Sequence, residues 1–181
     1  MIGRTGLHDS NGQLAGVRAC VFDAYGTVFD VESACQGQRD RFGPQAAALA
    51  TLWREKQLQY TWLRTAQDRH ADFAQVTRDA LAHALLALQL DPELEPALMQ
   101  AFNALEAFPE IRQVLQTLRG RGYATAILSN GTPDMLAALL ANAGIDGLFD
   151  AVYSVEAAFS SLAITVKCGP TKILIVGPGS S

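Results

Sequence analysis

An aspartate that directly follows a short apolar run is the residue of this chain with the clearest capacity for chemistry. Residues 19–22 have the length and composition of a buried strand, which ends at Asp23 before Gly26 opens a turn. A carboxylate at the carboxyl end of a buried strand is costly unless it is used, and open α/β sheets bind their ligands at that edge. Asp23 is therefore a candidate nucleophile, although an isolated Asp-x-x-Gly is more often a turn or helix-capping aspartate.

A second polar pair follows a second apolar run. Ser129 and Asn130 come directly after residues 123–128, which also have the pattern of a buried strand. Because the ends of adjacent parallel strands meet at one edge of a sheet, we expect this pair to lie near Asp23. Ser129 can donate a hydroxyl hydrogen bond to a carboxylate, and Asn130 can donate an N–H. The alternative is a Ser-Asn-Gly turn that caps the next helix.

Apolar periodicity between these two strands predicts three helices. Residues 45–64 and 73–90 carry apolar side chains at helical spacing, and Pro92 suits the first turn of a third helix that runs to about Leu105. The first apolar stripe consists of Ala48, Leu49, Leu52, Trp53, Leu58 and Trp62, and the second of Ala80, Leu81, Ala84, Leu85 and Leu88. We therefore expect a helical insertion directly after the first strand.

The rest of the chain alternates helix and strand. Residues 109–121 predict an amphipathic helix, and another helix is expected from Thr132 or Asp134 to Gly144. The inward side chains of the helix at 109–121 are expected to be Ile111, Val114, Leu115 and Leu118. Strands are expected at 149–154 and, in the tail, at 172–176. This order predicts an α/β fold with a parallel, doubly wound, Rossmann-type sheet.

The overall composition is that of a globular protein with little basic character. The 181 residues are 49% hydrophobic and 18% charged, with a net charge of -4, which argues against a nucleic-acid partner. No apolar run is long enough to span a bilayer, so no membrane partner is expected. The first residues lack the apolar core of a signal peptide, and the three cysteines show no paired spacing. These features indicate reduced thiols and a cytoplasmic location.

The string Phe22-Asp-Ala-Tyr-Gly-Thr27 resembles the first motif of the haloacid dehalogenase superfamily, and more narrowly of its type II, L-2-haloacid dehalogenase branch. Phosphatases of the superfamily place a second Asp two residues after the nucleophile, as a general acid beside a magnesium site. Here that position is Tyr25. A halide is a weak base that leaves without a proton, so no general acid is required. Without the second carboxylate, the site also has one fewer oxygen ligand for a hard cation such as magnesium. The resemblance implies carboxylate attack with no metal and no other cofactor.

Residues 52–64 resemble a second family string, Leu-Trp-Arg-x-[Lys/Arg]-Gln-Leu-x-Tyr-[Thr/Ser]-Trp. A helix arginine is usually solvated, but the resemblance implies that Arg54 reaches the active site and stabilises the departing halide. A guanidinium is always charged, which suits an anion leaving a dry pocket. The same correspondence implies that Leu58 and Phe73 line an apolar pocket for the substrate side chain. A core role for both stays open.

The string Ile127-Leu-Ser-Asn-Gly resembles the second motif of the family. By that resemblance Ser129 and Asn130 help to bind the substrate carboxylate, and Ala24 and Tyr25 also belong to the substrate-binding residues. Thr27 is expected to donate a hydrogen bond to the Asp23 carboxylate and orient it.

The resemblance implies hydrolytic dehalogenation of short-chain (S)-2-haloacids to (R)-2-hydroxy acids through an ester on Asp23. Backside attack inverts the stereocentre once, and water then attacks the ester at the Asp23 carbonyl. A homodimer is left open. Two alternatives remain: a phosphatase of the same superfamily, which Tyr25 argues against, and an inactive remnant.

The resemblance also predicts the domain layout. A helical cap is expected over residues 33–106, and a haloacid dehalogenase-like α/β core over 17–32 and 107–181, with its C-terminal part incomplete. Residues 1–16 are expected to be a loose leader. The family pattern fails after Glu156, where a Tyr-Lys-Pro segment with an essential lysine and a later acidic motif are expected. We hypothesise that a frameshift or a truncation explains this loss, and sequencing of the encoding DNA would test the idea.

Overall fold

The computed structural model describes residues 17–37, 44–69, 71–156 and the backbone of 172–176. The expected leader, residues 1–16, lies outside the described residues, and so do residues 157–171 of the tail. In the part of the chain that is described, no helix is long and apolar enough to cross a membrane.

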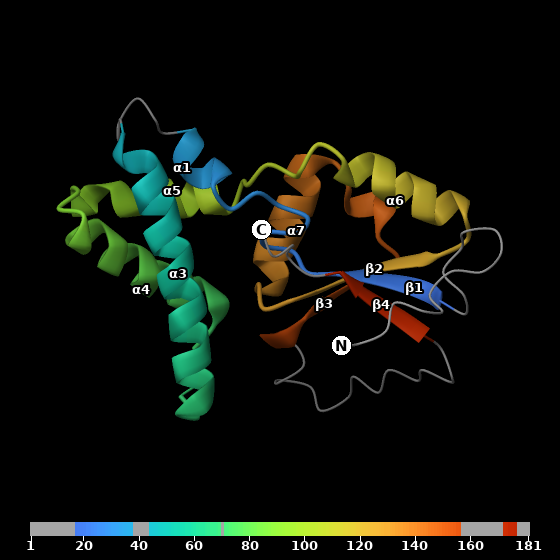
Figure 1. The fold of residues 1–181 in the computed structure, drawn as a ribbon, viewed down its shortest axis with the longest axis horizontal. Helices are drawn as coiled ribbons and strands as arrows, with labels where there is room; N and C mark the ends of the chain where they lie inside the picture. The colour runs from blue at the N-terminus through green and yellow to red at the C-terminus, as the bar shows by residue number, and fades with distance from the viewer. Residues whose placement is uncertain (1–16, 38–43, 70, 157–171, 177–181) are drawn as a thin grey trace, which may run out of the picture.

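Four parallel strands form one sheet in the order β3-β2-β1-β4 (Figure 1). The strands are β1 (Val17–Phe22), β2 (Ala124–Ser129), β3 (Ala151–Ser154) and β4 (Lys172–Val176). The α/β fold with a parallel sheet is therefore confirmed, and so is the strand expected at 172–176. Because β2 and β3 lie on one side of β1 and β4 on the other, the strand order reverses beside β1. Ligands bind at such a reversal in open α/β sheets.

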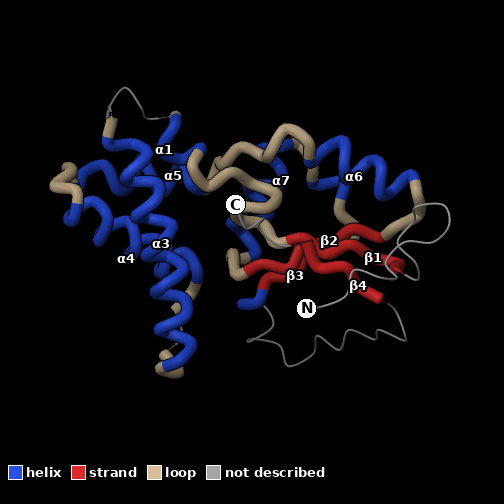
Figure 2. The backbone as a smooth tube through the Cα atoms, viewed as in Figure 1, coloured by secondary structure: helices blue, strands red, loops and turns tan. Residues whose placement is uncertain are grey.

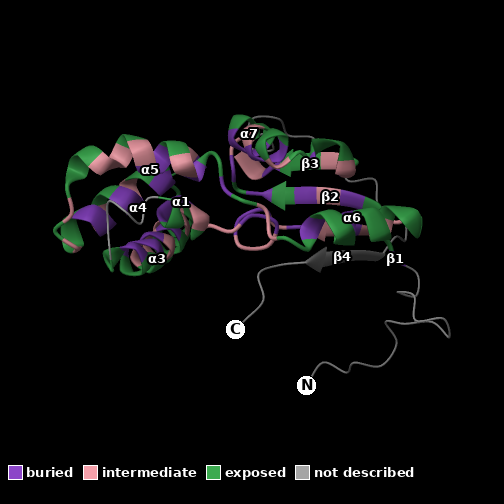
Figure 3. Ribbon diagram, turned by 90° about the horizontal axis from the view of Figure 1, so that it is seen from above, coloured by how far each residue is buried: buried purple, intermediate pink, exposed green. Residues whose placement is uncertain are grey.

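The central strands bury the side chains that face the covering helices. Cys20 and Phe22 are two residues apart on β1, so they point to the same face of the sheet, and both are buried. Phe22 meets Phe149 edge to face, with ring centroids 6.1 Å apart. Buried positions on β1 and β2 are drawn in purple in Figure 3. The buried strand expected at 19–22 is thus confirmed in part, because Ala19 and Val21 are only half-buried.

Two helices, α6 (Ile111–Gly120) and α7 (Pro133–Ala143), lie on the same side of the sheet (Figure 1). The start of α7 is fixed by Thr132, whose Oγ1 accepts a hydrogen bond from the Met135 N–H. Its end is fixed by Gly144, which adopts a left-handed conformation with φ 62°. Of the two starts that the sequence allowed, Thr132 is the one observed.

The inward face expected for α6 is confirmed only in part. Ile111 and Leu115 are buried, and Leu118 packs against the core. The expectation for Val114 is wrong, because its side chain is 38% exposed. The apolar stripe of α6 is narrower than the sequence pattern predicts, since Val114 lies at the edge of the face rather than at its centre.

Helices α1 (Ser33–Gln36), α3 (Gln45–Ala66), α4 (Phe73–Ala87) and α5 (Glu95–Phe102) follow β1 in sequence, with the short 3₁₀ helix η1 (Pro92–Leu94) before α5. Together we call them the helical insertion. It lies beside the sheet with its covering helices, as Figures 1 and 2 show. Helices α3 and α4 pack against each other and provide most of its core. The third helix expected in the sequence is thus a 3₁₀ turn followed by a shorter α-helix.

The apolar stripe of α4 is confirmed, because Ala80, Leu81, Ala84 and Leu85 are buried and Leu88 packs against them. The stripe expected for α3 is partly wrong. Leu49 and Trp53 are buried, but Leu58 is 39% exposed and Trp62 is 71% exposed. The second half of α3 therefore presents apolar side chains to the surface.

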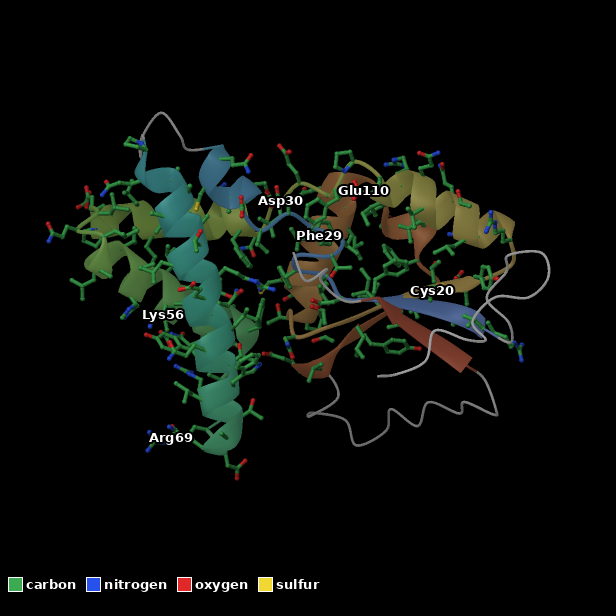
Figure 4. All side chains as sticks on the ribbon, in the orientation of Figure 1. Cys20, Phe29, Asp30, Lys56, Arg69 and Glu110 are labelled. Atoms are coloured by element: carbon green, nitrogen blue, oxygen red, sulfur yellow. The ribbon has the colours of Figure 1, made fainter. Side chains whose placement is uncertain are left out.

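The chain leaves the sheet and returns to it through two adjoining segments. The Asp30 N–H donates to the Glu106 carbonyl at 2.8 Å, and the Phe108 N–H donates to the Val28 carbonyl at 3.0 Å. Phe29 forms an antiparallel bridge with Ala107 between these two bonds. In Figure 4, Phe29 and Asp30 lie on the outgoing segment, between the sheet and the insertion. The insertion is thus joined to the sheet at one narrow place.

Candidate active site

Asp23 lies at the carboxyl end of β1, as the sequence predicts, and its side chain is half-buried. Its Oδ1 accepts a hydrogen bond from the Ala24 N–H at 2.8 Å. Burial raises the pKa of Asp23, while the Ala24 N–H and the positive charge of Arg54 act to lower it, and burial is the larger effect. The carboxylate is therefore held in place but poorly solvated, which favours a nucleophile.

Arg54 reaches from α3 to the loop that follows β1. Its Nη2 donates to the Tyr25 carbonyl at 3.1 Å, and its Nη1 donates to Gln57 Oε1 at 2.8 Å. Burial lowers the pKa of Arg54, whereas Asp23 and Tyr25 act to raise it. The guanidinium nevertheless stays charged at neutral pH. The solvated surface position that helix arginines usually take is therefore excluded for Arg54.

Asp23 and Arg54 attract each other without touching. Among the described residues the ion pairs are Arg64–Asp79 and Arg78–Glu95, so no direct pair joins Asp23 to Arg54. A guanidinium has five N–H groups, and the two bonds above leave three of them for other partners. An anion and a cation that interact without a direct ion pair suit a reaction in which negative charge moves from one toward the other.

Tyr25 is buried and its ring lies between two aromatic side chains. The ring of Phe73 has its centroid 4.9 Å away, and Phe102 stacks on Tyr25 at 5.3 Å. Burial raises the pKa of Tyr25 well above its usual range, with the Asp23 charge acting in the same direction. The phenol is thus neutral, and its Oη is buried without a hydrogen-bond partner.

Gly131 lies against the same tyrosine. A Cβ at this position would lie 2.9 Å from both Cε2 and Oη of Tyr25, and 3.1 Å from a methyl carbon of Leu136. Only a residue without a side chain fits there, so the Ser-Asn-Gly sequence has a packing reason for its glycine. The loop after β2 thereby packs against the ring of Tyr25, two residues after Asp23.

Thr27 does not have the contact that the sequence predicts. Its Oγ1 is buried and has no hydrogen-bond partner, so the expected bond to Asp23 is wrong, and the Ala24 N–H fills that place. Thr27 Oγ1 and Tyr25 Oη are the two buried side-chain atoms that lack a partner in the described part of the chain. Buried hydroxyls usually find a partner, so these two hydroxyls within four residues of Asp23 are candidate donors to a ligand.

Ser129 and Asn130 differ in their surroundings. Ser129 is buried at the end of β2, and its Oγ accepts from the Gly131 N–H at 3.2 Å. Ser154 at the end of β3 donates to the Gly131 carbonyl at 2.7 Å. Ser129 thus has the turn role that the sequence left open, while its own hydroxyl hydrogen remains available to a substrate. Asn130 is exposed.

A cavity of about 620 Å³ lies between the helical insertion and the loops that follow β2 and β3. Its wall includes Phe73 from α4, Asn130 from the loop after β2, and Glu156 after β3. The Glu156 carboxylate accepts a hydrogen bond from the Phe73 N–H at the start of α4. Asp23 and Arg54 do not line this cavity, and neither does Leu58. The contact expected between Leu58 and a substrate side chain stays a prediction.

The structure brings together Asp23, Ala24, Tyr25 and Arg54 through direct contacts, and Phe73 joins them through its ring. Gln57 is a member of the site that the sequence reasoning missed. It lies three residues after Arg54, on the same face of α3, and that spacing was the available signal. The described residues contain no group of three or more His, Cys, Asp or Glu side chains that could hold a metal ion.

Comparisons with known proteins identify the family of this chain. The model of the haloacid dehalogenase-like hydrolase family matches residues 17–159. The chain is 44% identical over 142 residues to (S)-2-haloacid dehalogenase 4A of Burkholderia cepacia, a match that covers 77% of this chain and 62% of that protein. It is 46% identical over 143 residues to the (S)-2-haloacid dehalogenase of Xanthobacter autotrophicus, covering 78% and 56%. The chain thus spans about 60% of the length of these curated relatives.

Solved structures give the same assignment. The L-2-haloacid dehalogenase of Xanthobacter autotrophicus with chloropropionic acid covalently bound is 39% identical and superposes with a TM-score of 0.76, covering 88% of this chain and 69% of that one. A dehalogenase solved with an intermediate complex is 36% identical, with a TM-score of 0.82 and coverage of 90% and 76%. The family model and these relatives show that the chain belongs to the haloacid dehalogenase-like hydrolases, in the L-2-haloacid dehalogenase branch.

Proposed function

We propose that this protein hydrolyses (S)-2-haloacids to (R)-2-hydroxy acids through an ester formed on Asp23. The observation that carries the proposal is the half-buried Asp23 carboxylate, which faces the Arg54 guanidinium without pairing with it. The (S)-2-haloacid dehalogenase names of the relatives support the substrate class.

In the first step a carboxylate oxygen of Asp23 attacks the carbon that carries the halogen. The new C–O bond forms as the carbon–halogen bond breaks, and the bonding electron pair leaves with the halide. No proton is transferred, so no general acid is needed. The charge that Asp23 loses appears on the halide, where the free N–H groups of Arg54 stabilise it.

In the second step a water molecule attacks the ester at the carboxyl carbon of Asp23, and the bond from that carbon to the substrate oxygen breaks. The 2-hydroxy acid leaves with one proton of the water on that oxygen, and the other proton goes to solvent as the Asp23 carboxylate is restored. The substrate carbon is attacked only once, from the side opposite the halogen, so its configuration inverts. An (S)-2-haloacid therefore gives an (R)-2-hydroxy acid.

The substrate needs a partner for its carboxylate and an apolar wall for its side chain. We assign the carboxylate to the Ser129 hydroxyl, the Asn130 amide and the unpartnered hydroxyls of Thr27 and Tyr25, because each can donate a hydrogen bond. Phe73 is the apolar wall, since it is buried beside Tyr25 and lines the cavity.

A phosphatase reaction fits the site less well. A phosphate ester releases an alkoxide, which is a strong base and needs a general acid. The residue two positions after Asp23 is Tyr25, a buried phenol whose pKa is raised and whose oxygen has no partner. It offers neither the second carboxylate nor a ligand for a hard cation.

The test is to incubate the protein with (S)-2-chloropropionate in metal-free buffer and to follow chloride release and the mass of the Asp23 peptide. Steady chloride release supports the complete reaction. One equivalent of chloride with a stable mass increase on Asp23 supports alkylation without hydrolysis, and thus an impaired enzyme. Absence of chloride from the (S) enantiomer would contradict the proposal. Matched controls are the (R) enantiomer and Asp23→Asn, and phosphate release from phosphoesters with magnesium would favour the phosphatase.

We further propose a cytoplasmic homodimer. Cys20 and Cys35 are buried free thiols, which suits a reducing compartment. Leu58 and Trp62 lie four residues apart on one face of α3 and are 39% and 71% exposed, so they offer an apolar surface to a second copy. Cell fractionation and analytical ultracentrifugation test the two parts of this proposal separately.

A further inference from the structure

A buried polar chain lies behind the arginine of the site. Gln57 on α3 is 1% exposed and Thr77 on α4 is 0% exposed, and both lie among apolar side chains. Glutamine and threonine are mostly surface residues, and buried polar groups are retained when their hydrogen bonds are made. In this case the bonds lead from the backbone of α4 to the guanidinium of Arg54.

The donor and the acceptor of each hydrogen bond in this buried series can be assigned. Thr77 Oγ1 donates its single hydrogen to the Phe73 carbonyl at 2.6 Å, so it can only accept from Gln57 Nε2 at 2.7 Å. The amide nitrogen of Gln57 therefore faces Thr77, and its oxygen must face Arg54, whose Nη1 donates to it at 2.8 Å. The Trp53 Nε1–H donates to the Thr77 carbonyl at 2.9 Å and holds α3 against α4.

The packing leaves the arginine little freedom. Gln57 holds Nη1, and the Tyr25 carbonyl holds Nη2, so two points of the planar guanidinium are fixed. A small pocket of about 10 Å³ has Arg54, Gln57 and Phe102 in its wall, and this volume is at the lower limit for one water molecule. Little space is therefore left for water beside the Gln57 oxygen.

We propose that Gln57 and Thr77 are positioning residues that aim the Arg54 guanidinium at the departing halide. The inference rests on the proposed dehalogenation and extends it. Neither residue touches the substrate: Thr77 fixes which end of the Gln57 amide faces Arg54, and Gln57 fixes the plane of the guanidinium. Since Arg54 acts on the charge that develops on the halogen, its misalignment slows carbon–halogen cleavage and leaves substrate binding nearly unchanged.

The test uses Gln57→Met, which keeps the length of the side chain and removes the acceptor. Ester formation on Asp23 is followed in single-turnover mass spectrometry with (S)-2-chloropropionate and (S)-2-bromopropionate. We expect the rate with the chloride to fall by about 10- to 100-fold, the loss on the order of that from misplacing a catalytic group. The half-saturating substrate concentration should change by less than about threefold, because ground-state binding is retained. Bromide, the better leaving group, should lose less, so the bromide-to-chloride rate ratio rises.

Thr77 and Gln59 provide the matched variants. Thr77→Val keeps the shape but releases the Gln57 amide, so it should reproduce part of the loss, and Thr77→Ser should restore the wild-type rate. The double variant of Gln57→Met and Thr77→Val should be no slower than Gln57→Met alone, because both act on one chain. Gln59→Met, on the same helix but exposed and bonded to Lys56, should have no effect.

The outcomes separate the two proposals. Wild-type protein that forms no ester and releases no halide would overturn both of them. Two results would overturn the positioning role alone if the wild type forms the ester. One is an equal rate loss of Gln57→Met with the chloride and the bromide substrate, and the other is a double variant whose rate loss is the product of the two single losses. If Gln57→Met does not fold, as judged by circular dichroism, the comparison of Thr77→Val with Thr77→Ser decides: equal rates in these two variants exclude the role.

Discussion

At the residue scale, opposing effects act on the charge of Asp23. Burial disfavours the charged carboxylate, while one N–H and one distant cation favour it only in part. A carboxylate that is poorly stabilised in the ground state can become a bonded ester with little loss of solvation. The same residue is expected to reduce the stability of the folded chain, as functional groups often do.

The first prediction concerns the pH dependence of stability. The pKa of Asp23 is raised in the folded state, so the folded protein binds a proton more tightly than the unfolded chain. The free energy of unfolding should therefore fall as the pH rises from the usual aspartate range through the raised pKa, and stay lower above it. Asp23→Asn should be more stable than the wild type at neutral pH, and urea unfolding at neutral and acid pH measures the difference.

The stability difference between Asp23→Asn and the wild type should shrink in acid, where the side chain at position 23 is uncharged in both proteins. A gain of equal size at all pH values would show that the charge is not its cause. Ester formation by the wild type should decline in acid with a midpoint above the ordinary aspartate pKa, because the attacking group is the carboxylate.

The second prediction concerns the glycine under Tyr25. Gly131→Ala places a Cβ 2.9 Å from the ring and its oxygen, so the tyrosine must move and its stacking with Phe102 must change. We expect a loss of about 1–3 kcal/mol in the free energy of unfolding, as for other overpacked sites, and slower ester formation. Gly120→Ala on α6 is the control, since nothing lies within 4 Å of its Cβ, and it should be neutral or stabilising. Equal effects of the two variants would contradict the packing argument.

At the element scale, much of the architecture could be predicted because it depends on local signals. Helix α7 begins at a threonine that caps it and ends at a left-handed glycine, and both are visible in the sequence. The position of Asp23 and of Ser129 at neighbouring strand ends follows from the order of apolar runs. The errors, at Val114 and in the second half of α3, concern which side of a helix is covered, and that depends on partners far away in the sequence.

The polar contacts of the site were harder to predict. The hydrogen bond between Gln57 and Thr77 joins two helices whose side chains meet only after packing. The spacing of residues in the sequence does not predict it. Thr27 shows the opposite error: the residue was recognised, but its expected contact is made by the Ala24 backbone instead. Side-chain partners are set by rotamers in the folded site, whereas residue types and strand ends are set by local sequence.

The third prediction concerns the start of α7, directly after the Ser-Asn-Gly turn. Thr132→Ala removes the side-chain acceptor of the Met135 N–H and should reduce the free energy of unfolding by about 1 kcal/mol. Thr132→Ser keeps the acceptor and should stay within a few tenths of a kcal/mol of the wild type. Urea denaturation measures both, and identical stabilities would show that the cap is not used.

At the scale of the whole molecule, the helical insertion faces the sheet across a cavity and meets it at few points. The described ties besides the connecting segments include Arg54 to the Tyr25 carbonyl and Glu156 to the Phe73 N–H. Arg69, which follows the end of α3, lines this cavity together with Asn130 and Glu156. This layout leaves the Leu58 and Trp62 side chains of α3 exposed, so that surface is available to another protein.

The fourth prediction concerns that surface. Trp62→Glu places a charge in the exposed apolar face of α3 and should weaken dimerisation at least about tenfold, or about 1.4 kcal/mol. Leu86→Glu on α4 is the control, because Leu86 is also exposed, at 80%, but lies on a different helix. Sedimentation velocity over a concentration series gives the dimer fraction. If both variants associate as the wild type does, α3 is not the interface.

The paired backbone hydrogen bonds between the segments at 28–30 and 106–108 bring the start and the end of the helical insertion together. Since the entry and exit of the inserted helices are one hydrogen bond apart, a turn of a few residues would close the gap if those helices were removed. The parallel strands would keep their register. A chain without these helices would therefore keep Asp23 at the end of β1 but lose Arg54 and Phe73, the side chains that the insertion brings to it.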